Sequence, residues 1–236
     1  MKKAPLIFDG AMGTVIYDRG VFINTCYDEL CLTNPKFILQ IHRDYVEAGA
    51  EVIETNTFGA NPLRLKPYGL AEKTEAINRA GVTLAREAAG EEIFVAGSVG
   101  PCTESRQRMP DAFAPEVEAA FRTQMGALAA GGVDLFLLET FSNLNELQLA
   151  ARVAREFGKP VLASFVLNDR GRPPWGCGRR RWRQPSPATT TWTSSGSTAA
   201  RALPAHSTRS RRSSPTPGNR WSSCRTRGCP GKSAGA

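Results

Sequence analysis

The chain has 236 residues and a formal net charge of +8 at pH 7, but that charge is spread very unevenly. Residues 171–236 contain 12 Arg, one Lys and no acidic residue, so residues 1–170 hold 17 basic and 22 acidic groups and carry a net charge of −5. A basic protein often has a nucleic-acid or membrane partner, but here that argument applies only to the tail. The apolar run near the start ends at Asp9, too early for a signal peptide or a membrane span, so no membrane association is expected.

Short apolar runs in the first part of the chain predict five β-strands. Most of these runs end in glycine or polar residues, as strands of parallel sheets commonly do. The runs cover residues 6–8, 52–57, 93–96, 135–138 and 160–165. The first is followed by residues 9–14, where two glycines predict a tight turn, and the second closes with four polar residues, 54–57.

Four helices are expected between these strands, because apolar residues recur there at helical spacing. They begin near Asn34-Pro35, before Ile77, at Pro115 and at Asn143, and the first three end at Gly49, Gly90 and Gly131. Asn34 and Asn143 are expected to act as N-caps, and the glycines as C-terminal stops.

Alternation of strands and helices predicts a parallel α/β fold. No GxGxxG motif follows the first strand, which argues against a dinucleotide-binding sheet. A (β/α)8 barrel needs eight strands and about 250 residues. We therefore predict that residues 1–170 form a partial (β/α)8 TIM barrel of about five βα units, with its first and fifth strands as open edges. Residues 171–236 are expected to form a disordered, low-complexity basic tail.

Three segments near the predicted strand ends carry a specific resemblance. They are residues 9–14 (DGAMGT), 48–58 (AGAEVIETNTF) and 132–140 (GVDLFLLET). In this order they resemble the signature segments of the homocysteine S-methyltransferase family, and the likeness spans nearly all of residues 5–170. Within the family it is strongest to the N-terminal barrel of cobalamin-dependent methionine synthases, and to the similar barrel fused to methylenetetrahydrofolate reductase in some bacteria.

The resemblance implies methyl transfer to the thiol of homocysteine, giving methionine. A thiol is a poor nucleophile at neutral pH, and the family activates it with zinc held by three cysteines. Those cysteines lie in Gly-x-Asn-Cys and Gly-Gly-Cys-Cys segments, and neither segment occurs here. We therefore expect no metal ligand, no catalytic residue and no activity in this chain. The methyl donor stays open, because cobalamin and methyltetrahydrofolate would act through modules not present here, and other branches use betaine or S-methylmethionine.

The six cysteines form no CxxC pair and suggest no disulfide framework, which is typical of a reduced, cytoplasmic protein. Three of them lie in the first part of the chain: Cys26, Cys31 and Cys102. These do not occupy the positions of the family's zinc ligands and are expected to be ordinary thiols. The other three lie in the tail.

The resemblance also implies a site for the amino-acid part of homocysteine. Asp9 and Glu139 would hold its amino group, and backbone amides near Gly10 would receive its carboxylate, a role that turn amides can fill. Glu54 is a further substrate-binding candidate. Simpler roles are also open: Asp9 could cap a strand end, Gly10 could serve only the turn, and Glu54 could pair with a neighbouring basic side chain.

The tail is compatible with the family's missing segments in another reading frame. Codons beginning one nucleotide earlier could encode Leu-Asp-Val-Val-Gly-Val-Asn-Cys across residues 192–199, and a segment with Pro-Asn-Ala-Gly-Leu-Pro across residues 222–236. The first contains the missing Asn-Cys pair, and the second is similar to the family's seventh-strand segment. We therefore interpret residues 171–236 as a truncation of the family sequence followed by an out-of-frame extension, with the change between about residues 168 and 192.

Two other functions fit the composition less well. Arginines with isolated tryptophans could track a phosphate backbone and stack bases, but the tail has no RGG or RS repeat, so specific nucleic-acid binding is not expected. The chain could also be a non-catalytic remnant that binds an amino acid. Zinc content separates these readings, because an active enzyme needs about one zinc ion per chain and a remnant needs none.

Overall fold

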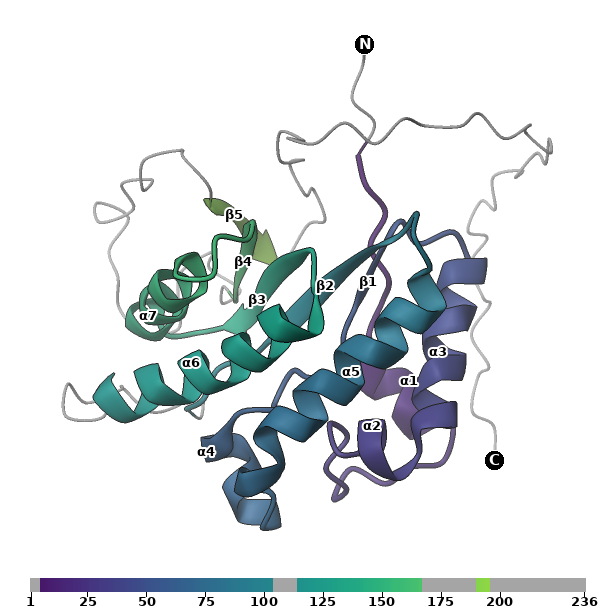
Figure 1. The fold of residues 1–236 in the computed structure, drawn as a ribbon, viewed down its shortest axis with the longest axis horizontal. Helices are drawn as coiled ribbons and strands as arrows, with labels where there is room; N and C mark the ends of the chain where they lie inside the picture. Colours follow the sequence, from purple (N-terminus) through teal and green to yellow (C-terminus); the bar gives the residue numbers. More distant parts are fainter. Residues whose placement is uncertain (1–4, 104–113, 167–189, 196–236) are drawn as a thin grey trace, which may run out of the picture. The chain divides into compact units, whose positions relative to one another are not determined.

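The computed structural model describes residues 5–103 and 114–166 in full, and residues 190–195 by their backbone. Five parallel strands form one sheet in the order β1-β2-β3-β4-β5, which is also their order along the chain (Figure 1). They are β1 (Val52–Glu54), β2 (Phe94–Val99), β3 (Leu135–Phe141), β4 (Val161–Val166) and β5 (Thr190–Ser195). A parallel bridge from Phe8 to Val52 places the first predicted strand beside β1. Parallel pairing of each strand with the next is the wall of an incomplete (β/α)8 barrel, as predicted.

Seven α-helices connect or precede these strands in the described residues. They are α1 (Met12–Asp18), α2 (Leu30–Thr33), α3 (Pro35–Glu47), α4 (Pro62–Leu65), α5 (Thr74–Ala89), α6 (Ala114–Gly131) and α7 (Leu144–Arg155), with two short 3-10 turns, η1 (Lys66–Tyr68) and η2 (Ala71–Lys73). Helices α3, α5, α6 and α7 confirm the four predicted from spacing, and successive members pack against one another (Figure 1). The predicted tight turn differs: neither Gly10 nor Gly13 takes a positive φ, and helix α1 begins at Met12.

The ends of the helices follow the local signals, with one exception. The Asn143 side chain accepts hydrogen bonds from the amides two and three residues later, at 3.0 and 3.4 Å, and so caps α7 as predicted. Asn34 precedes α3, but its side chain makes no capping hydrogen bond. Gly49 and Gly90 take φ values of 100° and 58° just after α3 and α5, where a residue with a Cβ would be strained.

These two asparagines make a matched pair for a stability test. We expect Asn143→Ala to lower the free energy of unfolding by about 1 kcal/mol, because two first-turn amides lose their acceptor. Asn34→Ala should change it much less, since no capping bond is lost. Urea unfolding followed by circular dichroism measures both, and equal losses for the two variants would contradict the assignment of Asn143 as the cap.

The structure differs from the prediction in one segment of the tail. The composition predicts no strand after residue 170, but β5 pairs in parallel with β4 along its whole length, from Thr190 beside Val161 to Ser195 beside Val166. The segment is rich in threonine and contains a tryptophan, residue types that favour strands. Without β5, the outer edge of β4 would carry unpaired backbone N–H and C=O groups. β5 pairs with this edge, so the fifth predicted strand is not an open edge. The other residues of the tail lie outside the described part of the chain.

Apolar side chains pack on both faces of the sheet. The larger cluster lies between the strands and helices α5, α6 and α7, and includes Phe121 of α6 with Phe136 and Leu138 of β3. A smaller cluster on the opposite face contains Val52, Ala96, Leu137 and Leu162. Alternate residues of a strand point to opposite faces, which is why Leu137 belongs to the second cluster and its two neighbours to the first.

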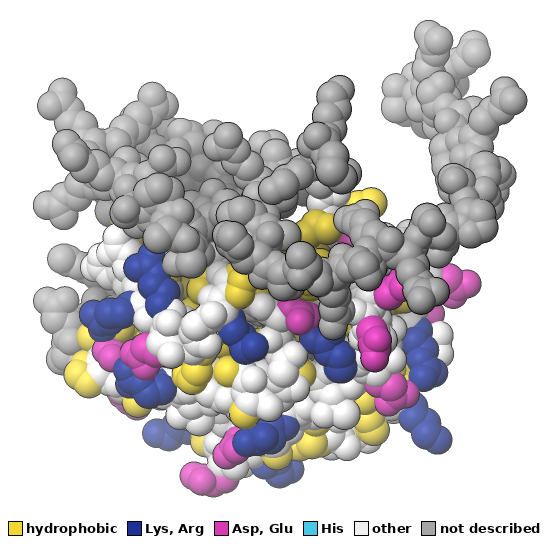
Figure 2. Space-filling view, turned by 45° about the horizontal axis from the view of Figure 1, so that its top comes forward, with side chains coloured by type: hydrophobic (Ala, Val, Ile, Leu, Met, Phe, Trp, Pro, Cys, Tyr) yellow, Lys and Arg dark blue, Asp and Glu magenta, His cyan; other side chains and the backbone are white. Residues whose placement is uncertain are grey.

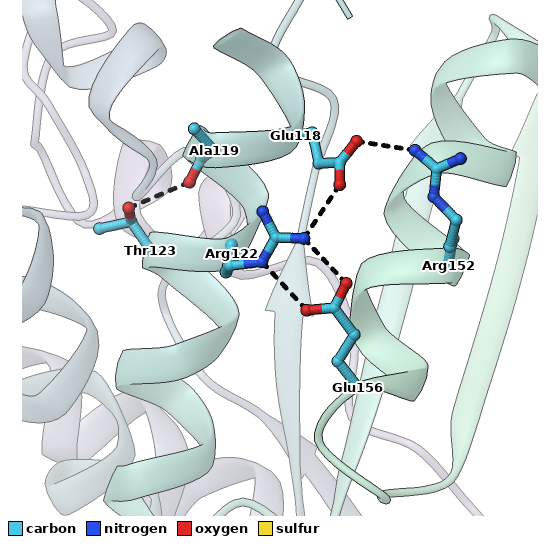
Figure 3. A network of polar contacts seen from close by, with 6 residues as sticks. All are labelled: Glu118, Ala119, Arg122, Thr123, Arg152 and Glu156. Atoms are coloured by element: carbon cyan, nitrogen blue, oxygen red, sulfur yellow. Dashed lines mark hydrogen bonds and ion pairs between the residues drawn. The ribbon is translucent and has the colours of Figure 1, made fainter. Parts of the chain in front are cut away.

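The packed helices α6 and α7 are also joined by an ion-pair network (Figure 3). Arg122 pairs with Glu118 at 2.9 Å and with Glu156 at 2.8 Å, and Arg152 pairs with Glu118 at 2.7 Å. All four side chains are partly exposed, so each pair adds little stability by itself. None of its members lines the cleft described below.

Candidate functional site

A cleft of about 720 Å³ opens at the carboxyl ends of the first strands. Ligands of (β/α)8 barrels bind at this end of the sheet. The charged residues that line the cleft are Asp9, Asp28, Glu54, Arg64 and Glu139. All four substrate-binding residues expected from the sequence therefore meet in one place, since Gly10 lines it as well.

The periodicity of the strands explains why the acidic side chains converge. On each of three strands, a polar residue comes two positions after a member of the smaller apolar cluster. The pairs are Val52 and Glu54, Ala96 and Ser98, and Leu137 and Glu139. A side chain two positions along a strand points to the same face, so these polar groups continue the apolar face toward the strand ends. Asp9 comes directly after the bridge residue Phe8, on the neighbouring first strand.

Hydrogen bonds join these groups across the first strand and β1, β2 and β3. The amide of Glu54 donates to Asp9 Oδ2 at 2.9 Å, so Asp9 does cap a strand end, as one simpler reading expects. Its other oxygen, Oδ1, is buried and has no hydrogen-bond partner. Glu54 is hydrogen-bonded to Glu139 and has no basic partner among the described residues, and Ser98 Oγ donates to Glu139 Oε1.

Burial changes the acidity of all three carboxyl groups. Loss of solvent raises the pKa of Asp9 to about 7 and raises the pKa of Glu54 well above its usual range, and the negative charge of Glu139 raises both further. The pKa of Glu139 is also raised by burial, while its hydrogen bonds from Ser98 and Glu54 oppose that rise. Burial and mutual repulsion thus oppose full ionisation of the three carboxyl groups together.

A buried network of hydroxyl groups supports this cluster, and sequence reasoning did not find it. Thr55 Oγ1 accepts from the amide of Ser98 at 3.0 Å and contacts Thr57 Oγ1 at 2.6 Å. Thr57 Oγ1 donates to the carbonyl of Ser98 at 2.9 Å, and Gln124 of α6 donates to the carbonyl of Thr57 at 2.7 Å. The network fixes the backbone on both sides of Ser98 and so orients the hydroxyl that binds Glu139. The polar residues after the second and third strands were the only sequence signal for it.

Gly10 has a steric reason to lack a side chain. A Cβ at this position would lie 3.1 Å from the Tyr45 hydroxyl oxygen and 3.2 Å from a ring carbon of Tyr45, closer than such atoms normally come. Tyr45 in turn donates to the carbonyl of Ala11 at 3.4 Å. The glycine therefore lets the chain pass close to Tyr45 at the edge of the cleft, on the way into α1.

The three cysteines of the described residues form no disulfide with one another. Cys26, Cys31 and Cys102 are buried and free, and burial raises the pKa of each. Cys31 Sγ donates to the carbonyl of Asn56 at 3.3 Å, and only Cys26 lines the cleft. No group of three histidine, cysteine or acidic side chains in the described part of the chain has the arrangement of a metal site.

The comparisons with known proteins agree with this geometry. The sequence profile described as Homocysteine S-methyltransferase matches residues 6–182. The chain belongs to the homocysteine S-methyltransferase family. That assignment fits the strand-end segments on which the resemblance was based, and the matched region ends inside the window expected for the change of frame.

Solved structures of a homocysteine methyltransferase, MmuM from Escherichia coli, share the fold. The chain is 28% identical to the metallated form with a TM-score of 0.63, and the match covers 73% of this chain and 68% of that one. For the oxidized form the identity is 30% and the TM-score 0.64, with 73% and 67% covered. For the apo form they are 27% and 0.55, with 73% and 65% covered. The existence of a metallated form shows that this member of the family holds a metal.

One face of the described residues carries charges of both signs. Figure 2 shows basic and acidic side chains interspersed on the described face, without a broad basic patch. None of the helices within the described ranges is both long and apolar enough to cross a membrane.

Proposed function

We propose that the cleft binds homocysteine by its amino group, as the substrate site of a homocysteine S-methyltransferase. The observation that carries the proposal is the buried, unpaired Oδ1 of Asp9, which lies in a cleft shared with Glu54 and Glu139. A buried acceptor without a partner is costly, and an ammonium group supplies both the missing donor and a compensating charge. Methyl transfer to homocysteine is the activity named for the family.

The three acidic residues would divide the work of binding. Asp9 Oδ1 accepts one ammonium hydrogen, and Glu139, held in place by Ser98, accepts a second. The raised pKa of Glu54, caused by burial and by the neighbouring carboxylates, opposes the build-up of three full negative charges in the site. The carboxylate of the substrate would lie near the amides that follow Gly10.

We further propose that this 236-residue chain does not transfer methyl groups. The family's metal is proposed to be zinc, and the described residues do not fit it: the three cysteines are buried, and no three histidine, cysteine or acidic side chains of the described part form a metal-binding group. No step of a reaction is therefore assigned to these residues. The division into a barrel part, residues 1–170, and an out-of-frame tail, residues 171–236, belongs to the same proposal. So does a location in the reducing cytoplasm, which suits three free thiols.

The methyl donor is left open by this proposal. No described residue is assigned to cobalamin or methyltetrahydrofolate. A nucleic-acid partner is not proposed either, because the described face carries charges of both signs and the basic residues of the tail show no binding repeat.

Titration of the purified chain with two thiols tests the proposal. Homocysteine should bind, whereas 4-sulfanylbutanoate, which keeps the thiol and carboxylate but lacks the amino group, should bind at least ~10-fold more weakly. Metal analysis of the same sample should find far less than one zinc ion per chain, and incubation with methyl donors should give no methionine. Equal affinity for the two thiols would contradict the ammonium site, and stoichiometric zinc with methionine formation would contradict the proposed inactivity.

A further inference from the structure

Arg64 is the only basic side chain among the described residues that line the cleft. It lies in α4, where its backbone amide donates to Asn61 Oδ1 at 3.0 Å, and Asn61 is fully buried. The base of the side chain is therefore held firmly. The guanidinium group itself is exposed and makes no hydrogen bond or ion pair with any described residue.

The two carboxylates on which the charge of Arg64 acts, Asp28 and Glu146, accept hydrogen bonds from other donors. Asp28 Oδ1 accepts from the amide of Gly59 at 2.9 Å. Glu146 accepts from the amides of Cys102 and Thr103 at 2.8 and 3.0 Å, and from the Thr103 hydroxyl at 2.6 Å. Arg64 acts on both carboxylates only through its charge, which opposes the rise in pKa that burial gives them. No described residue engages its fork of N–H donors, which lies in the lining of the cleft.

The charges of the cleft are thus divided into two groups. Asp9, Glu54 and Glu139 act on one another, and Arg64 is not among the charges that shift their acidity. Arg64 instead lies within electrostatic range of Asp28 and Glu146. A ligand that uses both groups must carry a cationic centre and, at some distance from it, an anionic one.

We infer that Arg64 binds the carboxylate of a zwitterionic ligand and so selects such ligands over simple cations. Guanidinium and carboxylate pair through two parallel hydrogen bonds, a geometry that a lysine or an amide does not reproduce. The inference rests on the proposed function, and two ligands of that reaction carry the required group. One is homocysteine itself, and the other is a zwitterionic methyl donor that would enter beside it, if the amides near Gly10 hold the carboxylate of homocysteine.

Paired ligands with and without a carboxylate test the inference on the full-length chain. Calorimetric titrations would compare homocysteine with 3-aminopropanethiol, and trimethylglycine with tetramethylammonium, the latter two in the presence of homocysteine. Arg64→Gln should lower the affinity for homocysteine or for trimethylglycine by about 10-fold. The affinity for the analogue that lacks the carboxylate should stay unchanged. Arg64→Lys should recover only part of the loss. Arg79→Gln is the matched control, because Arg79 pairs with Glu75 on the exposed side of α5 and does not line the cleft.

Each outcome decides a different point. A loss for homocysteine assigns Arg64 to the substrate, and a loss for trimethylglycine alone assigns it to the methyl donor. If both acids bind the Arg64→Gln chain as they bind the unaltered one, the inference falls while the ammonium site stands. If the unaltered chain binds none of the four compounds, the proposed function falls with it. Equal affinity of each acid and its analogue for the unaltered chain overturns the inference without any variant.

Discussion

Homocysteine is expected to bind more tightly as the pH rises from 5.5 to 7.5, and Asp9→Asn is expected to remove most of that dependence. The pKa of Asp9 is raised to about 7, mainly by burial, so the carboxyl is neutral at the lower end of this range and largely ionised at the upper end. The amino group of the ligand stays protonated throughout. Affinity for this cation therefore grows as the carboxylate forms.

At pH 7.5 the Asp9→Asn chain should bind homocysteine ~10- to 100-fold more weakly, because a hydrogen bond between two charged groups becomes one between a charged and a neutral group. The variant keeps an oxygen that can accept the Glu54 amide, so the strand end that Asp9 caps is retained. Calorimetric titration at several pH values measures both effects.

The control for this experiment is another change of a carboxylate to an amide. Glu75→Gln removes an exposed carboxylate that pairs with Arg79 on α5, far from the cleft lining, and should leave the affinity and its pH dependence unchanged. An affinity that is flat between pH 5.5 and 7.5 in the unaltered chain would sink the assignment of Asp9. So would full affinity in the Asp9→Asn chain.

The same shift in pKa predicts a cost in stability at neutral pH. The folded chain keeps a proton on Asp9 up to about pH 7, whereas an unperturbed aspartate side chain has a pKa of 3.8. Between those values the folded state binds more protons than the unfolded state, so this group makes folding less favourable as the pH rises through that range. Ionisation of Asp9, which the cation site needs, therefore lowers the free energy of unfolding of the free protein.

The largest expected effect on stability is that of Phe121→Ala. Phe121 of α6 is 0% exposed and packs in the cluster between the helices and the sheet, with its ring centroid 6.1 Å from that of Phe141 of β3. Removing the ring leaves a cavity, and such a change costs about 3–5 kcal/mol. Because domains are commonly stable by only about 5–15 kcal/mol, the variant should lose a large share of its stability and unfold at a clearly lower temperature and urea concentration.

Phe22→Ala is the matched control, since Phe22 is 76% exposed and its truncation removes no buried contact. Its free energy of unfolding should stay within about 0.5 kcal/mol of that of the unaltered chain. Thermal and urea unfolding followed by circular dichroism would compare the three proteins. Similar losses for the two variants would mean that α6 does not pack on the sheet as described.

The sequence by itself determined the elements whose signals are local. Helices α3, α5, α6 and α7 follow from apolar spacing, and Asn143 capped its helix because a cap needs only the next three residues. The strands follow from short apolar runs, and the polar residues after them marked the end of the sheet where ligands bind. The family segments, which lie at those ends, pointed to Asp9, Gly10, Glu54 and Glu139 as neighbours.

Only the tertiary structure decided what depends on groups far apart in the chain. The pairing of β5 with β4 depends on an edge that the sequence cannot display, and α1 replaces a turn that two glycines favoured. Asp9 Oδ2 accepts from the amide of Glu54, 45 residues away, while Oδ1 is buried without a partner in the described structure. Among the described residues, Arg64 likewise lacks a hydrogen-bonded carboxylate because Asp28 and Glu146 accept from other donors. Residue types and spacing set which groups can meet, but burial and hydrogen bonding set which of them remain available to a ligand.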